Sequence, residues 1–265
     1  GTVGMVKNVP AGMSPGSDVA NLSVLGYDPF TYYSGRSPLE AVSMGVDMEE
    51  ADVSFRCNLV TLDPQEGEIP YAQRTILDHS ADEITTEEAA QLLEALQPIL
   101  ANKQSLHLGV SYRHCLLVKQ GELGSQCTPP HDILGKQIEA YLPQGTYGPI
   151  LTQMMAQSYT ILKDHPVNKA RIAKGLRPAN AAWFWGEGRK PNLTPFQELY
   201  HLDGAVICAV DLIRGIALCA GMEHIAVPGA TGAIHTNFYG KGQAALAALA
   251  KGKDFVFVHI ESPDE

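Results

Sequence analysis

Short apolar runs alternate with helix-like segments from Ala205 to the end of the chain. An apolar run from Ala205 is followed by a helical pattern over 211–220, a glycine-rich loop, a second helical pattern over 242–250 and an apolar run over 255–259. This alternation is typical of a layered α/β sheet. Open α/β sheets hold their ligands at the carboxyl ends of strands, and the last run is followed by Glu261, Asp264 and Glu265.

Composition narrows the class of protein further. The chain has 265 residues, 45% of them hydrophobic, which is enough for one large domain or two ordinary ones. The formal net charge of −10 argues against general binding of nucleic acid, which requires a basic face. No apolar run approaches the length of a membrane span, and the first residues do not read as a signal peptide. Five cysteines without CxxC spacing favour a reducing cytoplasm.

A serine stands on a Pro-Gly turn at the start of a predicted helix. Gly16 allows a tight turn, and the apolar spacing of Val19, Leu22 and Leu25 predicts a helix with a buried face. The hydroxyl of Ser17 would then lie at a positive helix end, where N–H groups can hold a phosphate and a metal can lower the hydroxyl pKa. Two interpretations remain open, because Ser17 is either a nucleophile or an ordinary helix cap.

The middle of the chain contains further helix and strand patterns. Thr85 to Glu88 form a capping-box pattern before a helix that carries Ala89, Leu92, Leu93 and Leu96. Trp183 and Trp185 alternate on one face of a predicted strand, which favours a core position over a ligand contact. The other expected elements are strands over 52–61, 106–118 and 181–185 and helices over 133–141 and 150–162.

Several short blocks give the chain a resemblance to a known family. They are Pro15 to Leu22, Gly26 to Pro29, Tyr33 to Ala41, Phe55 to Asn58, Ser111 to His114, Pro130 to Ile133, Trp183 to Gly186, Pro228 to Gly232 and His259 to Glu265. In this order, and over nearly the whole chain, they resemble the archaeal-type, cofactor-independent phosphoglycerate mutases of the alkaline phosphatase superfamily.

The resemblance implies a fold, an activity and a mechanism. The expected fold is a partial alkaline-phosphatase-like α/β sheet domain, formed by 1–28 and 192–265 and incomplete at both ends. An inserted α+β phosphotransferase lid over 29–191 would bind the substrate. Ser17 would attack 3-phosphoglycerate to give phosphoserine and bound glycerate, whose 2-hydroxyl takes the phosphoryl group back as 2-phosphoglycerate.

The resemblance also implies cofactors and partners. Two divalent cations, Mn²⁺ or Mg²⁺, would use Ser17 and Asp264 as ligands, and no 2,3-bisphosphoglycerate would be needed. A further Asp ligand is expected before Gly1, and Asp and His ligands after Glu265, so that the chain reads as an internal fragment. The only expected partner is the small phosphoglycerate, with no nucleic acid or membrane, and the oligomeric state stays open.

Candidate substrate-binding residues come from the chemistry of anion recognition within this resemblance. Arginine forks match carboxylate and phosphate, which favours Arg56, Arg113 and Arg177. His114 and His131 can hydrogen-bond the phosphate or act on glycerate hydroxyls, with Asp132 as an orienting group or base. Asn58, in the block of Arg56, and Arg214, near a phosphate-binding position of the wider class, complete the set.

Other interpretations remain open at this point. Arg177 can instead close a loop before Pro178, and Asp264 can cap a loop after a proline. A related metal-dependent phosphatase or a phosphonate-processing enzyme would use the same serine. A catalytically inert, substrate-binding fragment is the remaining alternative.

Overall fold

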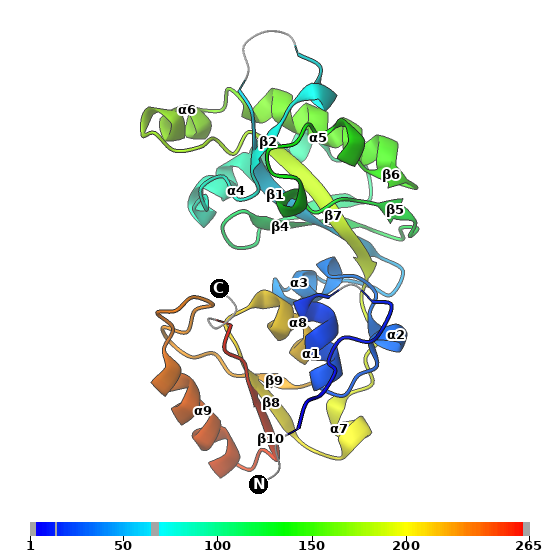
Figure 1. The fold of residues 1–265 in the computed structure, drawn as a ribbon, viewed down its shortest axis with the longest axis vertical. Coiled ribbons are helices and arrows are strands. Elements are labelled where there is room, and N and C mark those ends of the chain that lie inside the picture. Colours follow the sequence, from blue (N-terminus) through cyan, green and yellow to red (C-terminus); the bar gives the residue numbers. More distant parts are fainter. Residues whose placement is uncertain (1–3, 14, 65–68, 262–265) are drawn as a thin grey trace. The chain divides into compact units, whose positions relative to one another are not determined.

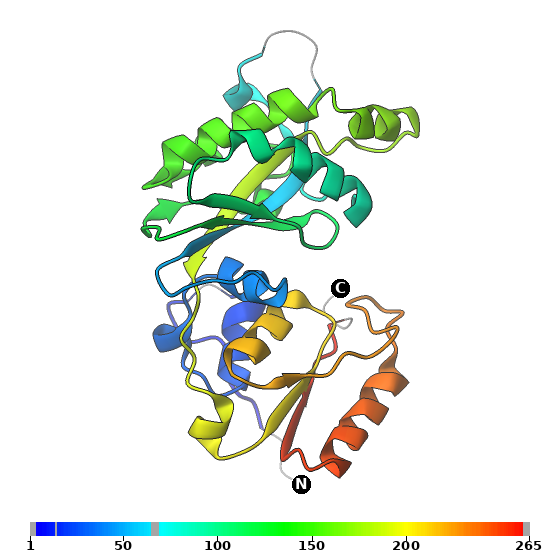
Figure 2. The same cartoon turned by 180° about the vertical axis from the view of Figure 1, so that it is seen from behind.

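The chain divides into two compact units. The computed structural model describes residues 4–13, 15–64 and 69–261. Unit 1 comprises Gly1–Asp47 and Lys190–Glu265, and unit 2 comprises Met48–Arg189. Figure 1 and Figure 2 show the elements of each unit from opposite sides.

Unit 1 is a three-layer α/β structure around a short parallel sheet. Its strands are β8 (Gly204–Ile207), β9 (Glu223–His224) and β10 (Phe255–Val258), in the order β10-β8-β9. Its helices are α1 (Ser17–Val24), α2 (Pro29–Tyr32), α3 (Ser37–Ser43), α7 (Phe196–Tyr200), α8 (Asp211–Cys219) and α9 (Phe238–Ala250). Helix α9 lies on one side of the sheet and α1 and α8 on the other (Figure 1). The α/β pattern expected after Ala205 is thus confirmed.

Residues 29–47 belong to unit 1, so the expected start of the inserted segment at residue 29 is wrong. Helix α3 packs directly on α8, because Gly215 leaves no side chain between the two backbones. A Cβ at Gly215 would lie 1.9 Å from the carbonyl oxygen of Leu39. Ser43 Oγ also donates a hydrogen bond to Asp211 Oδ1 at 2.9 Å. These contacts join residues far apart in the sequence, so local patterns do not reveal them.

Unit 2 is built on an antiparallel sheet. Its strands are β1 (Val53–Leu62), β2 (Ile76–Asp78), β3 (Gln104–His107), β4 (Arg113–Val118) and β7 (Ala181–Arg189). Strand β1 pairs with β4 and β7, its end pairs with β2, and β3 pairs with β4. A separate pair is formed by β5 (Ser125–Gln126) and β6 (Gln144–Gly145).

Helices cover one face of the unit 2 sheet. They are α4 (Thr86–Ala95), α5 (Gly148–Leu162) and α6 (Pro166–Ala173), with 3-10 turns over Tyr71–Gln73, Gln97–Ile99, Pro130–Ile133 and Glu139–Tyr141. The predicted capping box is confirmed, since Thr85 and Glu88 exchange side-chain-to-backbone hydrogen bonds at the start of α4. Helix α5 lies along β7 (Figure 2). Within the described residues, no helix is both long and apolar enough to cross a bilayer.

Two expectations for unit 2 are wrong in detail. The expected strand over 106–118 is two antiparallel strands, β3 and β4, which reverse direction through a turn where Ser111 adopts φ +57°. The expected helix over 133–141 does not form. Gly135 has φ +76°, and the following backbone pairs with β2 instead, where Ile76 N–H donates to Lys136 O and Gln137 bridges Thr75. A left-handed residue ends a helix, and the neighbouring strand takes the freed backbone groups.

Candidate active site

Ser17 is the first residue of α1, and it does not cap the helix. The N-cap is Gly16 in an extended conformation, and no side chain makes a capping hydrogen bond at this end. The interpretation of Ser17 as an ordinary cap is therefore wrong. The following residue, Asp18, is buried and accepts hydrogen bonds from Val19 N–H and from the Tyr33 hydroxyl, the latter at 2.6 Å. Burial, followed by the charge of Asp18, raises the pKa of Tyr33.

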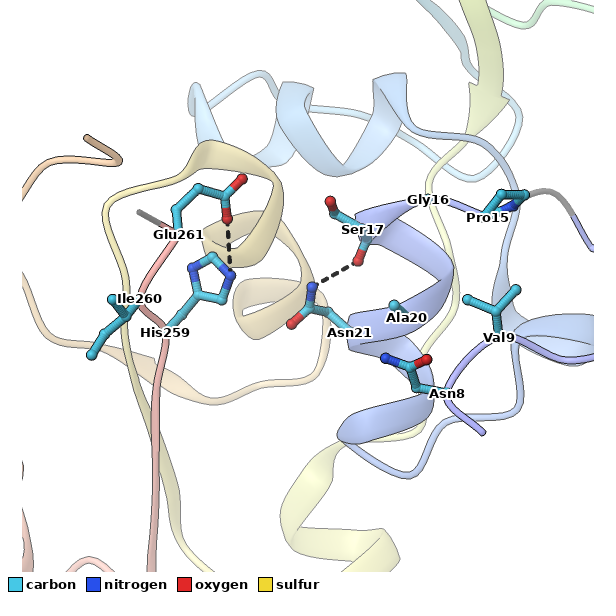
Figure 3. Close-up of a pocket in the computed structure, with 10 residues that line it drawn as sticks. All are labelled: Asn8, Val9, Pro15, Gly16, Ser17, Ala20, Asn21, His259, Ile260 and Glu261. Atoms are coloured by element: carbon cyan, nitrogen blue, oxygen red, sulfur yellow. Dashed lines mark hydrogen bonds and ion pairs between the residues drawn. The ribbon is translucent and has the colours of Figure 1, made fainter. Parts of the chain in front are cut away.

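A cavity of about 620 Å³ opens beside Ser17. Asn21 lies one helical turn after Ser17 and donates from Nδ2 to the Ser17 carbonyl oxygen at 2.8 Å. Across the cavity, His259 and Glu261 follow β10, and His259 Nε2 lies 3.1 Å from Glu261 Oε2 (Figure 3). Asn8 contributes a further amide to the wall. The cavity thus faces a hydroxyl, two amides and a His–Glu pair at the carboxyl end of the sheet.

A buried lysine supports the far wall of this cavity. Lys241 on α9 is 1% exposed, and its Nζ donates to the carbonyl oxygen of His259 at 3.1 Å. The pKa of His259 is lowered by burial, which outweighs the opposing effect of Glu261 and is assisted by the Lys241 ammonium. Burial therefore favours the neutral form of the His259 imidazole.

The described residues beside the cavity do not form a metal site. Among them, no group of three or more His, Cys, Asp or Glu side chains is arranged to hold a metal ion. Asp264, the expected carboxylate ligand, lies outside the described residues. The donors beside the cavity do not by themselves fit two divalent cations, because each cation is expected to take several protein ligands.

Four of the predicted substrate-binding residues gather in unit 2. Ring and guanidinium contacts link Arg56 on β1, Arg113 on β4 and His131 in the 3-10 turn Pro130–Ile133. Asn58 on β1 joins them through hydrogen bonds. We call these four residues, together with His79, Tyr112 and Trp185, the basic–aromatic cluster.

Successive contacts connect the two guanidinium groups of the basic–aromatic cluster. Arg56 Cζ lies 4.3 Å from the centre of the Trp185 ring, and the His131 ring lies 5.4 Å from that ring. His131 is 6.0 Å from His79, and His79 is 5.5 Å from Tyr112, between ring centres. Arg113 Cζ lies 4.3 Å from the centre of the Tyr112 ring. Two guanidinium groups and two imidazoles in one cluster suit an anion that carries both a carboxylate and a phosphate.

Asn58 supports this cluster. Asn58 is 1% exposed. Its Oδ1 accepts a hydrogen bond from Trp185 Nε1–H at 3.0 Å, and its Nδ2 donates one to His79 O at 3.1 Å. The side chain thereby ties β1 to β7 and to the segment after β2. With both ends of its amide engaged, Asn58 orients its neighbours.

The structure separates His114 from its neighbour Arg113. Side chains alternate along a strand, and His114 pairs with Cys57 on the face that packs against the helices. The imidazole is 1% exposed, and its Nδ1 accepts the Gly109 N–H at 3.2 Å. Burial lowers the pKa of His114 to about 3, so the imidazole stays neutral at pH 7. The structure does not bring His114 to the basic–aromatic cluster.

Three other predicted residues lie in different surroundings. Arg177 is 53% exposed at its side chain and forms ion pairs with Asp78 at 3.1 Å and Asp82 at 3.9 Å, beside the segment that carries His79. Asp132 is exposed and lies 3.6 Å from His131 Nε2. Arg214 is exposed on the first turn of α8, in unit 1.

Sequence reasoning missed several residues of the cavity beside Ser17 and of the basic–aromatic cluster. Asn21 had a usable signal, since it follows Ser17 by four residues and therefore shares its helix face. His79 and Tyr112 had no comparable signal, because their contacts with His131 and Arg113 depend on how separate strands and turns come together. Trp183 and Trp185 are both buried, as predicted. The contacts of Trp185 with Arg56 and His131 were not predicted.

Comparison with known proteins places these features in a family. The family model for 2,3-bisphosphoglycerate-independent phosphoglycerate mutase matches residues 1–168. The whole chain is 51% identical to the protein of that name from Methanosarcina barkeri and 48% identical to the one from Methanothrix thermoacetophila. It is 47% identical to a probable 2,3-bisphosphoglycerate-independent phosphoglycerate mutase from Geobacter sulfurreducens. The chain spans only 64 to 65% of the length of these relatives.

Solved structures agree with this result. A protein from Pyrococcus horikoshii matches with a TM-score of 0.72 at 27% identity, over 97% of this chain and 59% of its own. The cofactor-independent phosphoglycerate mutase from Thermoplasma acidophilum matches with a TM-score of 0.57 at 27% identity, over 94% of this chain and 65% of its own.

Proposed function

Because this chain belongs to the 2,3-bisphosphoglycerate-independent phosphoglycerate mutase family, we propose that the intact protein is an isomerase that interconverts 3-phosphoglycerate and 2-phosphoglycerate. The observation that carries this proposal is the position of Ser17. Ser17 is the first residue of α1, does not cap the helix, and lines the cavity of about 620 Å³ in unit 1. A hydroxyl at the positive end of a helix suits attack on a phosphoryl group.

The proposed reaction has two balanced steps. Ser17 Oγ attacks phosphorus, the bond between phosphorus and O3 of 3-phosphoglycerate breaks, and the hydroxyl proton of Ser17 ends on O3 of glycerate. The 2-hydroxyl of glycerate then attacks the phosphoserine, the bond between Ser17 Oγ and phosphorus breaks, and Ser17 regains a proton. N–H groups at the start of α1 stabilise charge on the phosphoryl oxygens. Water must be kept from the phosphoserine between the steps.

Unit 2 supplies the groups that bind the substrate in this proposal. The Arg56 and Arg113 guanidinium groups and the His131 imidazole hold the carboxylate and phosphate of phosphoglycerate, and Asp132 orients His131. Arg177 steadies the segment of His79, and Arg214 is a further candidate for phosphate. We extend the proposal to unit 2 as an inserted, substrate-binding lid.

The proposal for the intact protein includes two divalent cations, Mn²⁺ or Mg²⁺, which would neutralise charge on the transferring phosphoryl group when bound. Ser17 and Asp264 are their proposed ligands. No 2,3-bisphosphoglycerate takes part, in agreement with the names of the relatives. The proposed partner is the small phosphoglycerate, without nucleic acid or membrane. All five cysteines are free, which suits the proposed cytoplasmic location.

An enolase-coupled assay on the intact protein tests the proposal. Turnover of 3-phosphoglycerate is expected without added 2,3-bisphosphoglycerate, and Ser17→Ala should lower kcat by several orders of magnitude. Ser23→Ala is the matched control, because Ser23 is on the same helix and its Oγ donates a hydrogen bond to the backbone carbonyl of Val19. Release of free phosphate in place of 2-phosphoglycerate would instead identify a phosphatase, and phosphate mapped to another residue during turnover would overturn the role of Ser17.

A further inference from the structure

Trp185 touches three of the predicted substrate-binding residues at once. Its ring lies under the Arg56 guanidinium, its Nε1–H donates to Asn58 Oδ1, and its edge meets the His131 ring at an interplanar angle of 74°. Trp185, Arg56 and Asn58 are all buried, so the contacts among these three residues are shielded from water. A desolvated guanidinium over an indole is held more firmly than one at an exposed site.

The backbone next to Trp185 shapes a place for the stem of Arg56. The register between β1 and β7 shifts here, with Arg56 opposite Trp185 and Ser54 opposite Gly188, so β7 carries one extra residue. Gly186 lies inside this bulge with φ +67°, and a Cβ there would lie 3.7 Å from Arg56 Cγ. A bulge of this kind redirects a side chain. Arg56 thus runs past Gly186 and ends over the Trp185 ring.

Trp183 lies on the same strand face as Trp185 and provides a structural comparison. It is fully buried, and its Nε1–H donates to Thr128 O at 2.8 Å. Its register partner is Asn58, and the ring contacts of the basic–aromatic cluster involve Trp185 instead. The two tryptophans therefore differ in their contacts with predicted substrate residues while sharing strand, face and burial.

We propose that Trp185 is a positioning residue for substrate binding, which holds the Arg56 guanidinium and the His131 imidazole as a preformed pair for an oxyanion of phosphoglycerate. This inference rests on the proposed function for the identity of the ligand. Preformed donors bind more tightly, because less side-chain freedom is lost when the ligand arrives. Loss of the ring should weaken ground-state binding and transition-state binding alike.

Calorimetric titration of the intact protein with 3-phosphoglycerate, alongside the enolase-coupled assay, tests the inference. Trp185→Leu should raise both Kd and KM about tenfold and change kcat by less than about threefold, because uniform binding is lost. Trp185→Phe keeps a ring under Arg56 and should recover most of the affinity. Trp183→Phe should leave Kd and KM within about twofold of the wild type. Far-UV circular dichroism and thermal midpoints identify variants that do not fold.

The outcomes separate this inference from the proposed function. If Trp185→Leu folds and binds 3-phosphoglycerate as the wild type does, or if Trp183→Phe weakens binding equally, Trp185 has no positioning role. If Trp185→Leu does not fold, Trp185→Met, which fills space without a ring, replaces it: weaker binding of 3-phosphoglycerate by a folded Trp185→Met supports the role of the ring, and binding equal to that of the wild type overturns it. A wild type that binds 3-phosphoglycerate without turnover would refute the proposed function alone. A wild type that does not bind 3-phosphoglycerate would refute both.

Discussion

Lowering the pH from about 7.5 to about 5 should destabilise unit 2 through His114. The imidazole is 1% exposed on the core face of the sheet, and burial lowers its pKa from 6.5 to about 3. The unfolded chain binds a proton below pH 6.5, whereas the folded chain does not. Stability is therefore complete above pH 6.5 and decreases as the pH falls toward 3.

The magnitude follows from the size of this shift. Each pH unit below 6.5 and above 3 costs about 1.4 kcal/mol, so His114 alone should lower the free energy of unfolding by about 2 kcal/mol near pH 5. In His114→Gln, whose amide oxygen can still accept the Gly109 N–H, this part of the pH dependence should vanish. Other titrating groups act equally in both proteins and cancel in the comparison.

Urea unfolding followed by tryptophan fluorescence reports the stability of unit 2, which contains His114, because Trp183 and Trp185 both lie in that unit. His165→Asn is the matched control, since His165 caps α6 through Nδ1 and asparagine preserves a cap. If the wild type and His114→Gln lose the same free energy between the two pH values, within about 0.5 kcal/mol, the buried neutral imidazole is the wrong explanation.

Three further predictions concern local stability. Gly215→Ala should destabilise unit 1 by about 2 kcal/mol or more, because the new Cβ would overlap a carbonyl of α3. In Gly242→Ala on α9 the new Cβ meets nothing within 4 Å, so this variant should be more stable by up to about 1 kcal/mol. Thermal unfolding of both variants checks this pair. Thr85→Ala should cost about 1 kcal/mol by removing the cap of α4, measured by urea unfolding at pH 7. Burial tends to raise the pKa of Asp78, but hydrogen bonds, chiefly from backbone N–H groups, lower it to about 2. The stability that the ionised Asp78 contributes should be complete above pH 4 and lost as the pH falls toward 2. Asp78→Asn should therefore be less stable than the wild type at pH 7 and equal to it near pH 2. An unchanged difference in the free energy of unfolding at the two pH values would contradict this reasoning.

Local patterns predicted much of the fold correctly. The spacing of Val19 and Leu22 predicted α1, the capping box predicted α4, and the alternation after Ala205 predicted the parallel sheet of unit 1. Each of these signals is contained within one helix or strand and its caps. The helix expected over 133–141 failed because the backbone near Gly135 pairs with β2, a partner more than fifty residues away.

For the candidate site, the amino-acid sequence determined which residue types are present and where several of the helices and strands begin. It placed Ser17 at a helix start and proposed Arg56, Arg113 and Arg177, with His114 and His131, as substrate-binding residues. That Arg56, Arg113 and His131 share one cluster is visible only in the structure. Tertiary structure decided that His114 faces the core. Strand register and the bulge at Gly186 are set by pairing between distant segments, and a shift of one residue would exchange the two faces of a strand. For that reason the direction of a side chain is a long-range property, whereas the existence of a helix or strand is largely a local one.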